Sequence, residues 1–509
     1  MKRLQDSRVI NSVRNIGYRL SSQVITILLR FVERSIFIHV LGVEYLGING
    51  LFSQILQVLS MADLGFGTAM VYSMYKPLAE KDETKLAQLV QFYKKVYTVI
   101  AVSITILGVA LVPFLQYIVN LKSDIPYLRV YYLLYLANTV ASYLVVYKTC
   151  ILTADQKNYV VSKYNMIFSF VMTVVGSFFL WITRRFIVYL SIQVLITYIN
   201  NFTVSKVAEK NYPYILNKTE KLPKTESKAI FENIKSVFIY KLATTLVGSV
   251  DNTLISIIVG TIYVGYYSNY SMVIGNISLI VNMIFSSVTA SLGNLIVEGN
   301  ENKNYSVYKT MQFISFVFST IVITGTYLLI NDFIAIWLGP AYNLDNLVVV
   351  AMVINLYFSI VLMPIWSYRE ATGMYRQTKY VMVATAVVNL VVSLILAQYI
   401  GMAGILFASS IARITTYFWY EPKILFAQYF KKKATSYYSN IAINVIITLV
   451  VLKISISMFG NYDVNSWIDF IQKFSLSVMV VPLITIALYS WNKEMRKVIS
   501  IVKTIFKQR

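Results

Sequence analysis

Residues 30–47 decide how the rest of the chain is interpreted, and they read Arg-Phe-Val-Glu-Arg-Ser-Ile-Phe-Ile-His-Val-Leu-Gly-Val-Glu-Tyr-Leu-Gly. Arg30, Glu33 and Arg34 stand inside an apolar run at spacings of three and four residues, which places them on one face of a helix. The run ends at residues 42–47 in the motif Gly-x-x-Tyr-x-Gly, whose glycines predict a tight non-helical joint.

The same joint returns at residues 260–265, which lie 218 positions further along the chain. At this offset Glu33 matches Asp251, an acid inside another apolar run. The match continues without a gap through Ser53/Ser271, Ser60/Ser278, Ser73/Ser291, Glu80/Glu298, Glu83/Glu301 and Lys85/Lys303. The sequence therefore predicts an internal duplication with a charged feature inside each copy.

Composition restricts the chain to one broad class of protein. Of its 509 residues, 57% are apolar and 13% are charged, and the mean hydropathy is +0.63. Soluble domains carry about 25% charged residues, so this chain lacks the charge to coat a surface that faces water. Apolar runs of about 18 or more residues recur along it, and each can cross a bilayer as a helix. The composition predicts an all-α polytopic membrane protein.

About fourteen transmembrane helices are expected, at residues 18–41, 49–75, 93–119, 127–148, 160–182, 186–205, 236–259, 266–291, 311–331, 346–367, 380–399, 403–422, 437–459 and 468–491. The repeat offset places the first span on the seventh and the second on the eighth. Two six-helix lobes, residues 1–205 and 236–430, are therefore expected as parallel pseudo-repeats. Residues 206–235 form the predicted cytoplasmic linker, and residues 431–509 add two spans and a basic tail.

The distribution of basic residues predicts the orientation in the membrane. The net charge is +22, and 34 of the 45 lysines and arginines lie in connections on one side, against three on the other. This is the positive-inside pattern rather than the patch of a nucleic-acid-binding protein. Both termini are therefore expected in the cytoplasm. On this inner side, residues 77–92 and 297–310 are predicted to be short amphipathic helices at the membrane surface.

Several cations are predicted at mid-membrane depth. Arg30 lies near the middle of the first span, with Arg34 about one turn further out. A mid-helix arginine costs roughly 2.5–3.5 kcal/mol, so it usually faces a cavity or a partner. Arg413 in the twelfth span and Lys241 in the seventh add positive charge, although Lys241 can also snorkel to its helix end. Because the arginine fork gives bidentate hydrogen bonds to phosphate, we interpret these residues as a cationic substrate-binding cavity.

The acids Glu33, Asp251 and Asp63 are candidates for ion coupling or for charge pairing. Arg30, Glu33 and Arg34 together leave one positive charge over, which Asp251 is placed to neutralise at the duplicated position. Asp63 stands in the inner half of the second span beside glycines. A structural ion cluster that holds the helices together remains the alternative interpretation.

Other classes of site find no support in the sequence. Cys150 is the single cysteine and His39 the single histidine, which excludes an internal disulfide and a cysteine/histidine metal cluster. A Gly-x-x-x-x-Gly-Lys-Ser/Thr phosphate loop is absent from the sequence, so ATP hydrolysis by this chain is not expected. We expect a transporter with no cofactor and no catalytic residues.

The chain resembles the bacterial lipid-linked oligosaccharide flippases of the multidrug/oligosaccharidyl-lipid/polysaccharide exporter superfamily. The resemblance rests on Leu-Gly-x-x-Tyr-x-Gly at residues 41–47, Asp-Leu-Gly at residues 63–65, and Asp251 before Gly260. It also rests on the arrangement of twelve duplicated spans plus two.

The resemblance implies export of an undecaprenyl-pyrophosphate-linked repeat unit from the inner to the outer leaflet of the bacterial cytoplasmic membrane, for capsule, exopolysaccharide or another surface glycan. It implies alternating access and drive from a proton or sodium gradient. Expected partners are the lipid-linked oligosaccharide, membrane lipids, and the polysaccharide polymerase and glycosyltransferases of the pathway. Placing the cavity role on Arg30 and Arg34 rests on this sequence alone.

Three other functions stay open at this point. A cation-coupled multidrug antiporter of the same superfamily would need acids in excess of bases in its cavity. A peptidoglycan-precursor flippase would share the lipid-linked substrate class. A membrane scaffold or glycan-assembly enzyme would not move a lipid-linked sugar by itself.

Overall fold

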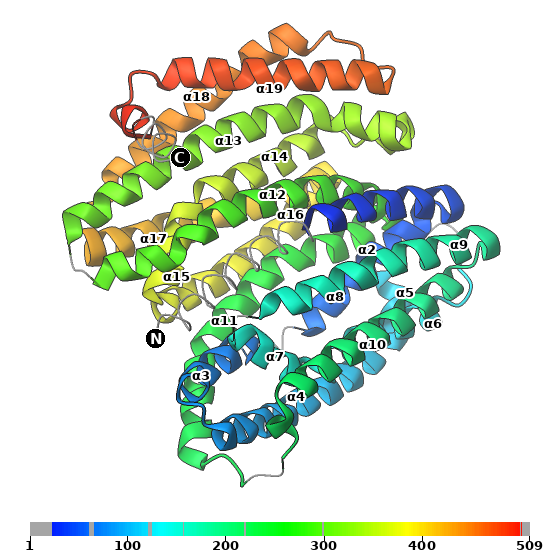
Figure 1. Cartoon of the computed structure of the whole chain (residues 1–509). Coiled ribbons are helices and arrows are strands. Elements are labelled where there is room, and N and C mark those ends of the chain that lie inside the picture. The colour runs from blue at the N-terminus through cyan, green and yellow to red at the C-terminus, as the bar shows by residue number, and fades with distance from the viewer. Residues whose placement is uncertain are drawn as a thin grey trace. The chain divides into compact units, whose positions relative to one another are not determined.

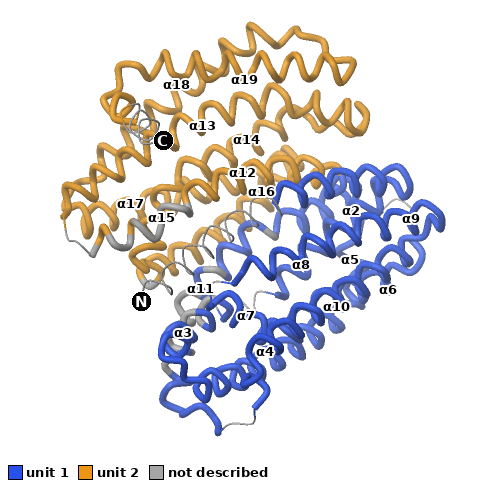
Figure 2. Tube along the Cα trace, in the orientation of Figure 1, with its two compact units in different colours: residues 1–265 blue, residues 266–509 orange. Residues whose placement is uncertain are grey.

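The computed structural model describes residues 23–60, 66–120, 125–155, 157–217, 220–297, 300–498 and 500. Within these ranges every regular element is a helix (Figure 1). The chain divides into two compact units, Met1–Gly265 (unit 1) and Tyr266–Arg509 (unit 2) (Figure 2). The predicted all-α class is confirmed.

The helix of unit 1 that comes first among the described residues covers positions 23–41, and we call it the first helix. The α-helices that follow are α2 (Val43–Leu59), α3 (Phe66–Glu80), α4 (Glu83–Leu111), α5 (Leu115–Ile118), α6 (Leu128–Tyr143), α7 (Val146–Ala154), α8 (Asn158–Val171), α9 (Ser177–Thr183), α10 (Phe186–Asn211) and α11 (Lys224–Leu254). Short pieces join or extend them: the 3-10 turns η2 (Val112–Phe114) and η4 (Pro213–Leu216), and the π-helical turns η3 (Met172–Gly176) and η5 (Ile255–Val259). Residues 206–235 thus include the end of α10, η4 and the start of α11.

Helix α12 (Thr261–Val297) begins in unit 1 and continues into unit 2. The other elements of unit 2 are α13 (Glu301–Leu338), η6 (Pro340–Tyr342), α14 (Asn346–Val361), α15 (Met363–Thr372), α16 (Tyr375–Thr415), α17 (Tyr417–Leu425), η7 (Phe426–Phe430), α18 (Thr435–Phe459) and α19 (Trp467–Tyr489).

The helices are long and apolar enough for a polytopic membrane protein. The described residues contain 9 candidate spans, or up to 11 if α6 with α7 and α14 with α15 each form one bent span. One candidate, Gln377–Phe430, has 54 residues and would extend about 80 Å if straight, against a hydrocarbon core of about 30 Å. It is broken inside α16, where Ile400 and Gly401 leave the helical conformation. The multi-pass class is confirmed, and the count of fourteen stays a prediction.

The backbone repeats at the offset found in the sequence. Gly42 has φ +87° and Gly260 has φ +130°, values that favour glycine because they crowd a Cβ atom. Helices α2 and α12 begin at the residues that follow, Val43 and Thr261. The two predicted joints are therefore non-helical, and each opens a helix at the equivalent position.

A second pair of helix starts obeys the same offset. Asp82 caps α4 by accepting a hydrogen bond from the backbone nitrogen of Lys85 at 2.8 Å. Asn300 caps α13 by accepting one from Lys303 at 3.0 Å. Since Asp and Asn are favoured N-caps for the same reason, the duplication has kept the function of this position.

The structure of residues 301–310 differs from the short surface helix that the sequence predicted. They are the beginning of α13, which runs without a break to Leu338. The predicted separate surface helix over 297–310 was therefore wrong. No proline or glycine stands between Glu301 and the apolar part of the helix, so nothing in the sequence ends the helix there.

The two copies contact each other at two equivalent places, and all four residues involved belong to unit 1. A Cβ atom added to Gly265 would lie 2.5 Å from the carbonyl oxygen of Val43. One added to Gly47 would lie closer still to the carbonyl oxygen of Thr261. Val43 and Thr261 are equivalent by the repeat, as are the two glycines. We call this the reciprocal glycine contact.

Unit 2 contains a buried ion pair between α15 and α17. Nη1 of Arg369 lies 3.0 Å from both carboxylate oxygens of Glu421, and the two side chains are 8% and 2% exposed. Arg369 lies inside α15 and Glu421 inside α17, so the pair joins two helices of unit 2.

The last two long helices join the rest of unit 2 through polar contacts. Asn444 of α18 accepts a hydrogen bond from Tyr357 of α14 at 2.6 Å and donates one to Tyr489 of α19 at 2.7 Å. Nζ of Lys473, on α19, lies 2.8 Å from Asp332 of α13. In a lipid environment such contacts satisfy polar groups that water cannot reach.

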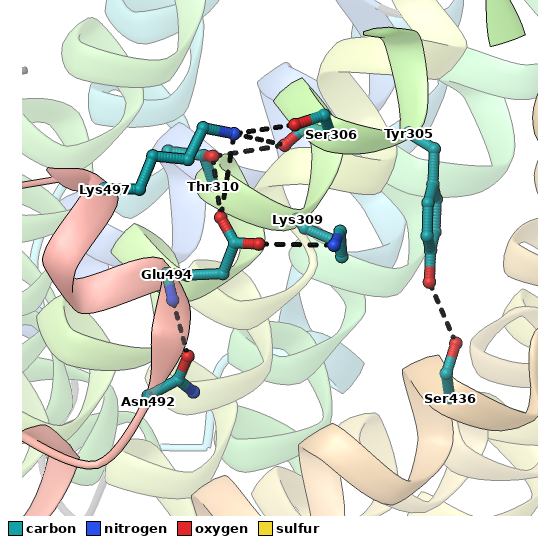
Figure 3. Close-up of polar contacts among 8 residues, drawn as sticks. All are labelled: Tyr305, Ser306, Lys309, Thr310, Ser436, Asn492, Glu494 and Lys497. Atoms are coloured by element: carbon teal, nitrogen blue, oxygen red, sulfur yellow. Dashed lines mark hydrogen bonds and ion pairs between the residues drawn. The ribbon is translucent and has the colours of Figure 1, made fainter. Parts of the chain in front are cut away.

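The C-terminal segment docks on the first turns of α13 (Figure 3). Glu494 accepts a hydrogen bond from Thr310 at 3.0 Å and lies 3.3 Å from Nζ of Lys309. Lys497 donates to the hydroxyl of Ser306 at 2.7 Å. The first turns of α13 are thus a docking site inside unit 2 for residues that lie more than 180 positions later in the chain.

We expect Gly47→Ala and Gly265→Ala to lower the free energy of unfolding by about 1–3 kcal/mol each, because the added methyl group overpacks the reciprocal glycine contact. Thermal unfolding in detergent would measure this. Gly325→Ala is the control, since a Cβ there has no heavy atom within 4 Å. Equal stability of all three variants would contradict the close contact.

Arg369→Ala should cost about 3–5 kcal/mol, because it leaves the Glu421 carboxylate buried without its partner. The double variant Arg369→Met/Glu421→Leu should recover most of that loss. The exposed pair of Lys76 and Glu80, 3.9 Å apart, is the control, and Lys76→Ala should cost about 0–1 kcal/mol. A small loss in Arg369→Ala would show that the pair is accessible to water.

Candidate functional site

A polar cavity of 470 Å³ lies inside unit 1, between the first helix, α8 with η3, and α10. Its charged lining residues are Arg30 and Glu33, both from the first helix. The other lining residues are Thr26, Leu29, Asn165, Phe168, Ser169, Met172, Thr173, Gln193, Ile196, Thr197 and Asn200. The volume lies in the range of about 300–1,000 Å³ found for small-molecule sites. We call this the Arg30 cavity.

Three polar stripes at helical spacing build its walls. The first helix contributes Thr26, Arg30 and Glu33, at steps of four and three residues. The second stripe consists of Asn165, Ser169 and Thr173 from α8 and η3, and the third of Gln193, Thr197 and Asn200 from α10. Residues at such spacings share one helix face, so each helix turns a polar face toward the cavity. The second and third stripes were not predicted, although their periodicity is visible in the sequence.

Two helices that form these walls are linked directly. The side-chain amide of Asn200 donates to Oδ1 of Asn165 at 2.9 Å. Oδ1 of Asn200 is shielded from solvent and accepts no hydrogen bond from the residues that the structure describes. Buried polar atoms are nearly always paired, so this oxygen can accept a hydrogen bond from a ligand or a water molecule.

Glu33 and Arg34 are held on the side of α10 and α6. A carboxylate oxygen of Glu33 accepts a hydrogen bond from the hydroxyl of Tyr189 on α10. Arg34 lies within electrostatic reach of Glu33, Tyr189 and Tyr135. Glu33 therefore touches both the cavity and a fixed phenol, while Arg30 is exposed at the cavity.

An aromatic cluster fixes the first helix against α10. The ring of Phe37 packs edge-on against Phe186 at 5.5 Å and against Tyr189 at 5.6 Å between centroids. Phe186 also contacts Tyr131 at 4.9 Å and Tyr45 at 5.4 Å. Because edge-to-face aromatic pairs have a defined geometry, this cluster sets the position of Glu33 one helical turn below Phe37.

The remaining predicted site residues lie elsewhere or outside the described part. Asp251 is buried on α11, a helix that packs against α2, and its pairing with Arg30 or Arg34 stays a prediction. Lys241 lies on α11 with a side chain that the structure does not describe, and Asp63 lies outside the described residues. Arg413 belongs to α16 in unit 2.

Arg413 has a structural partner within unit 2. Its guanidinium group donates to the backbone carbonyl of Asn355 on α14 at 3.1 Å. The side-chain oxygen of Asn355 accepts from Ser410 at 2.9 Å, and its amide donates to the carbonyl of Leu406 at 2.8 Å. Arg413 therefore takes part in a hydrogen-bonded link between α14 and α16.

The chemistry of the Arg30 cavity follows from its lining. Arg30 and Glu33 contribute one positive and one negative charge, so the lining carries no charge excess. Amides and hydroxyls both donate and accept hydrogen bonds, as hydroxyl-rich ligands require. The arrangement suits a neutral, hydroxyl-rich group together with one anionic group beside Arg30.

Comparison with known proteins agrees with this membrane fold. The family model described as "Polysaccharide biosynthesis protein" matches residues 12–290. Among curated proteins, no sequence matches this chain.

Solved transporter structures share the fold. The chain is similar to the lipid II flippase MurJ in its inward closed conformation, with 14% identity over 95% of this chain and 99% of that chain and a TM-score of 0.66. It is similar to the MATE multidrug transporter DinF-BH, with 14% identity over 82% and 97% and a TM-score of 0.57. The Vibrio cholerae MATE transporter VcmN gives 14% identity over 81% and 95% and a TM-score of 0.54.

The resemblance noted from residues 41–47 and 63–65 is therefore confirmed at the level of family and fold. Identities of 14% show a common fold and do not carry a substrate from one protein to another. Because the family model covers more than half of its length, this chain belongs to the polysaccharide biosynthesis protein family.

Proposed function

We propose that this protein is a flippase that moves a lipid-linked oligosaccharide across the cytoplasmic membrane of a bacterium, with the Arg30 cavity as its headgroup site. The observation that carries the proposal is a pocket lined by amides, hydroxyls and one arginine, two of whose walls, Asn158–Thr183 and Phe186–Asn211, are long and apolar enough to span a membrane. Membership of the polysaccharide biosynthesis protein family supports it.

The position of Arg30 supports a role toward an anion. It lies twelve residues before the joint at Gly42, or about 18 Å along a helix, which is well inside a hydrocarbon core of about 30 Å. An arginine at that depth costs roughly 2.5–3.5 kcal/mol unless water or a partner solvates it. A pyrophosphate headgroup gives the guanidinium the bidentate acceptor that its planar fork matches.

The neutral lining supports a glycan as the attached group. Gln193, Thr197 and Asn200 present donors and acceptors along one face of α10. Sugar hydroxyls need both functions, and they do not need a counter-charge. A lipid tail attached to the phosphate can remain in the bilayer while the headgroup occupies the cavity.

We assign Glu33 the coupling role in this cycle. It is the acid that lines the Arg30 cavity among the described residues, and Tyr189 holds one of its oxygens. Protonation of Glu33 would weaken its attraction for Arg30 and leave the guanidinium available to phosphate. Release of the proton would restore that attraction. Asp251, another of the three acids predicted for coupling or charge pairing, is assigned to charge pairing.

A peptidoglycan-precursor flippase is the second candidate, because the fold similarity to MurJ covers 95% of this chain. A multidrug antiporter fits less well. Cationic drugs call for an excess of acids, and the Arg30 cavity has one acid against one base.

We expect Arg30→Ala to slow flipping of a lipid-linked oligosaccharide about tenfold to a hundredfold in proteoliposomes, since a charge-assisted hydrogen bond contributes about 1.5–3 kcal/mol. Arg30→Lys should recover part of the rate, because it keeps the charge and loses the fork. Arg185→Ala is the control, as Arg185 is exposed at the start of α10. A normal rate in Arg30→Ala would refute the headgroup site, and efficient transport of lipid II alone would favour the second candidate.

The pair of Glu33 and Tyr189 separates a structural from a transport role. In a double-mutant cycle with Glu33→Gln and Tyr189→Phe, we expect a coupling energy of about 1.5–3 kcal/mol in thermal unfolding, since the hydrogen bond involves a charge. If Glu33 acts in coupling, Glu33→Gln should also abolish the dependence of flipping on an imposed pH gradient, while Tyr189→Phe should keep it. Retained gradient dependence in Glu33→Gln would leave Glu33 a structural residue.

A further inference from the structure

A second polar pocket in unit 1 is lined, among the residues that the structure describes, by uncharged residues alone. It measures 280 Å³ and is lined by Gln54 and Gln57 of α2 and by Thr244, Thr245 and Gly248 of α11. The two helices pack directly against each other. We call it the Gln54 pocket. Its volume falls just below the range of about 300–1,000 Å³ for complete ligand sites, so it suits part of a ligand.

The pocket lies on the seam between the two copies of the duplication. Helix α2 follows the joint at Gly42 and belongs to the first copy. Helix α11 leads through η5 to the joint at Gly260, so it is the counterpart of the first helix and belongs to the second copy. Transporters built from repeats hold their substrates near the bilayer midplane at the interface between the repeats.

Both walls of the pocket lie at the same depth. Gln54 stands twelve residues after Gly42, and Gly248 stands twelve residues before Gly260. At 1.5 Å per residue, each is about 18 Å from its joint, which is near the middle of a hydrocarbon core of about 30 Å. Arg30 also stands twelve residues from Gly42, so Arg30, Gln54 and Gly248 lie at about the same distance from their joints.

The pocket has hydrogen-bonding capacity that the protein does not use. Oε1 of Gln54 is shielded from solvent and has no hydrogen-bond partner among the residues that the structure describes. An unpaired buried acceptor costs about 1–3 kcal/mol, which a hydroxyl donor from a ligand would recover. Thr245 and Gln57 add donors and acceptors to the same lining.

Gly248 keeps the pocket open. A Cβ atom at this residue would meet nothing within 4 Å. By the repeat offset Gly248 is the counterpart of Arg30, so the second copy has open space where the first has a guanidinium group. The two equivalent positions therefore differ in chemistry: a guanidinium group in the first copy and uncharged open space in the second.

We propose that the Gln54 pocket is the subsite for one uncharged sugar ring of the transported glycan, which rests on the proposed flippase function. Amides pair with adjacent hydroxyls of a sugar, and the lining residues that the structure describes include no lysine, arginine, aspartate or glutamate to pair with an acidic or amino sugar. The pocket would therefore select for a neutral sugar, while Arg30 would bind the phosphate.

The test compares two ligands of the purified full-length protein in nanodiscs: a polyprenyl-pyrophosphate carrying a neutral oligosaccharide, and the same lipid without sugar. We expect Gly248→Leu, which fills the pocket, to weaken binding of the oligosaccharide lipid at least tenfold while binding of the sugar-free lipid stays unchanged. Gln54→Leu should shift the ratio of the two affinities in the same direction by a smaller factor. Gly325→Leu is the control, because a Cβ there also meets nothing within 4 Å.

An unchanged affinity ratio in both Gly248→Leu and Gln54→Leu would overturn the proposal while leaving the flippase function intact. Tighter binding of a uronic-acid-bearing glycan than of the neutral one by the unmodified protein would overturn the uncharged class of sugar. Failure of the unmodified protein to bind or move any oligosaccharide lipid would instead refute the proposed function. If Gly248→Leu does not fold, the affinity ratio measured for Gln54→Leu still tests the proposal, because this substitution changes the side-chain volume little.

Discussion

The close approach of backbone at the reciprocal glycine contact is the constraint on which the rest of unit 1 depends. Only residues without a side chain allow Gly47 to meet the carbonyl of Thr261 and Gly265 to meet that of Val43. The start of α12 is fixed further by Asn120, whose backbone exchanges hydrogen bonds with Thr261 at 2.8 and 2.9 Å. Because these helix starts are fixed, the distance of a residue from its joint follows from its position in the sequence. Residues that line the Arg30 cavity and the Gln54 pocket therefore lie at about the same distance from the joints.

The membrane environment explains why polar groups gather on a few helix faces. A polar side chain that faces lipid has no partner, so the amides and hydroxyls of α8 and α10 turn inward and share a cavity with Arg30 and Glu33. In unit 2, the same requirement explains why buried Arg369 is paired with the carboxylate of Glu421. The Arg30 cavity and the Gln54 pocket thus have the same cause, because each collects polar side chains that would lack partners in lipid.

Local signals in the sequence predicted the fold well, because glycine joints, apolar runs and N-caps act within a few residues. The duplication was visible at Gly42 and Gly260 for that reason. Contacts between distant residues could not be predicted in this way: the ion pair of Arg369 and Glu421 joins residues that are 52 positions apart. Arg30 and Glu33 could be predicted as site residues because charges inside an apolar run are rare. Uncharged cavity residues such as Asn165 and Gln193 could not, because their helical spacing is shared by many buried helices.

Figure 3 shows one further property of unit 2. Tyr305 contacts Ser436 at the start of α18, and Thr310 and Lys309 contact Glu494 after the end of α19. The start of α18 and the segment after α19 are therefore attached to neighbouring turns of α13. Lys473 on α19 also contacts Asp332 near the other end of α13. Because the α18–α19 hairpin is held at both of its ends, it forms a fixed part of unit 2.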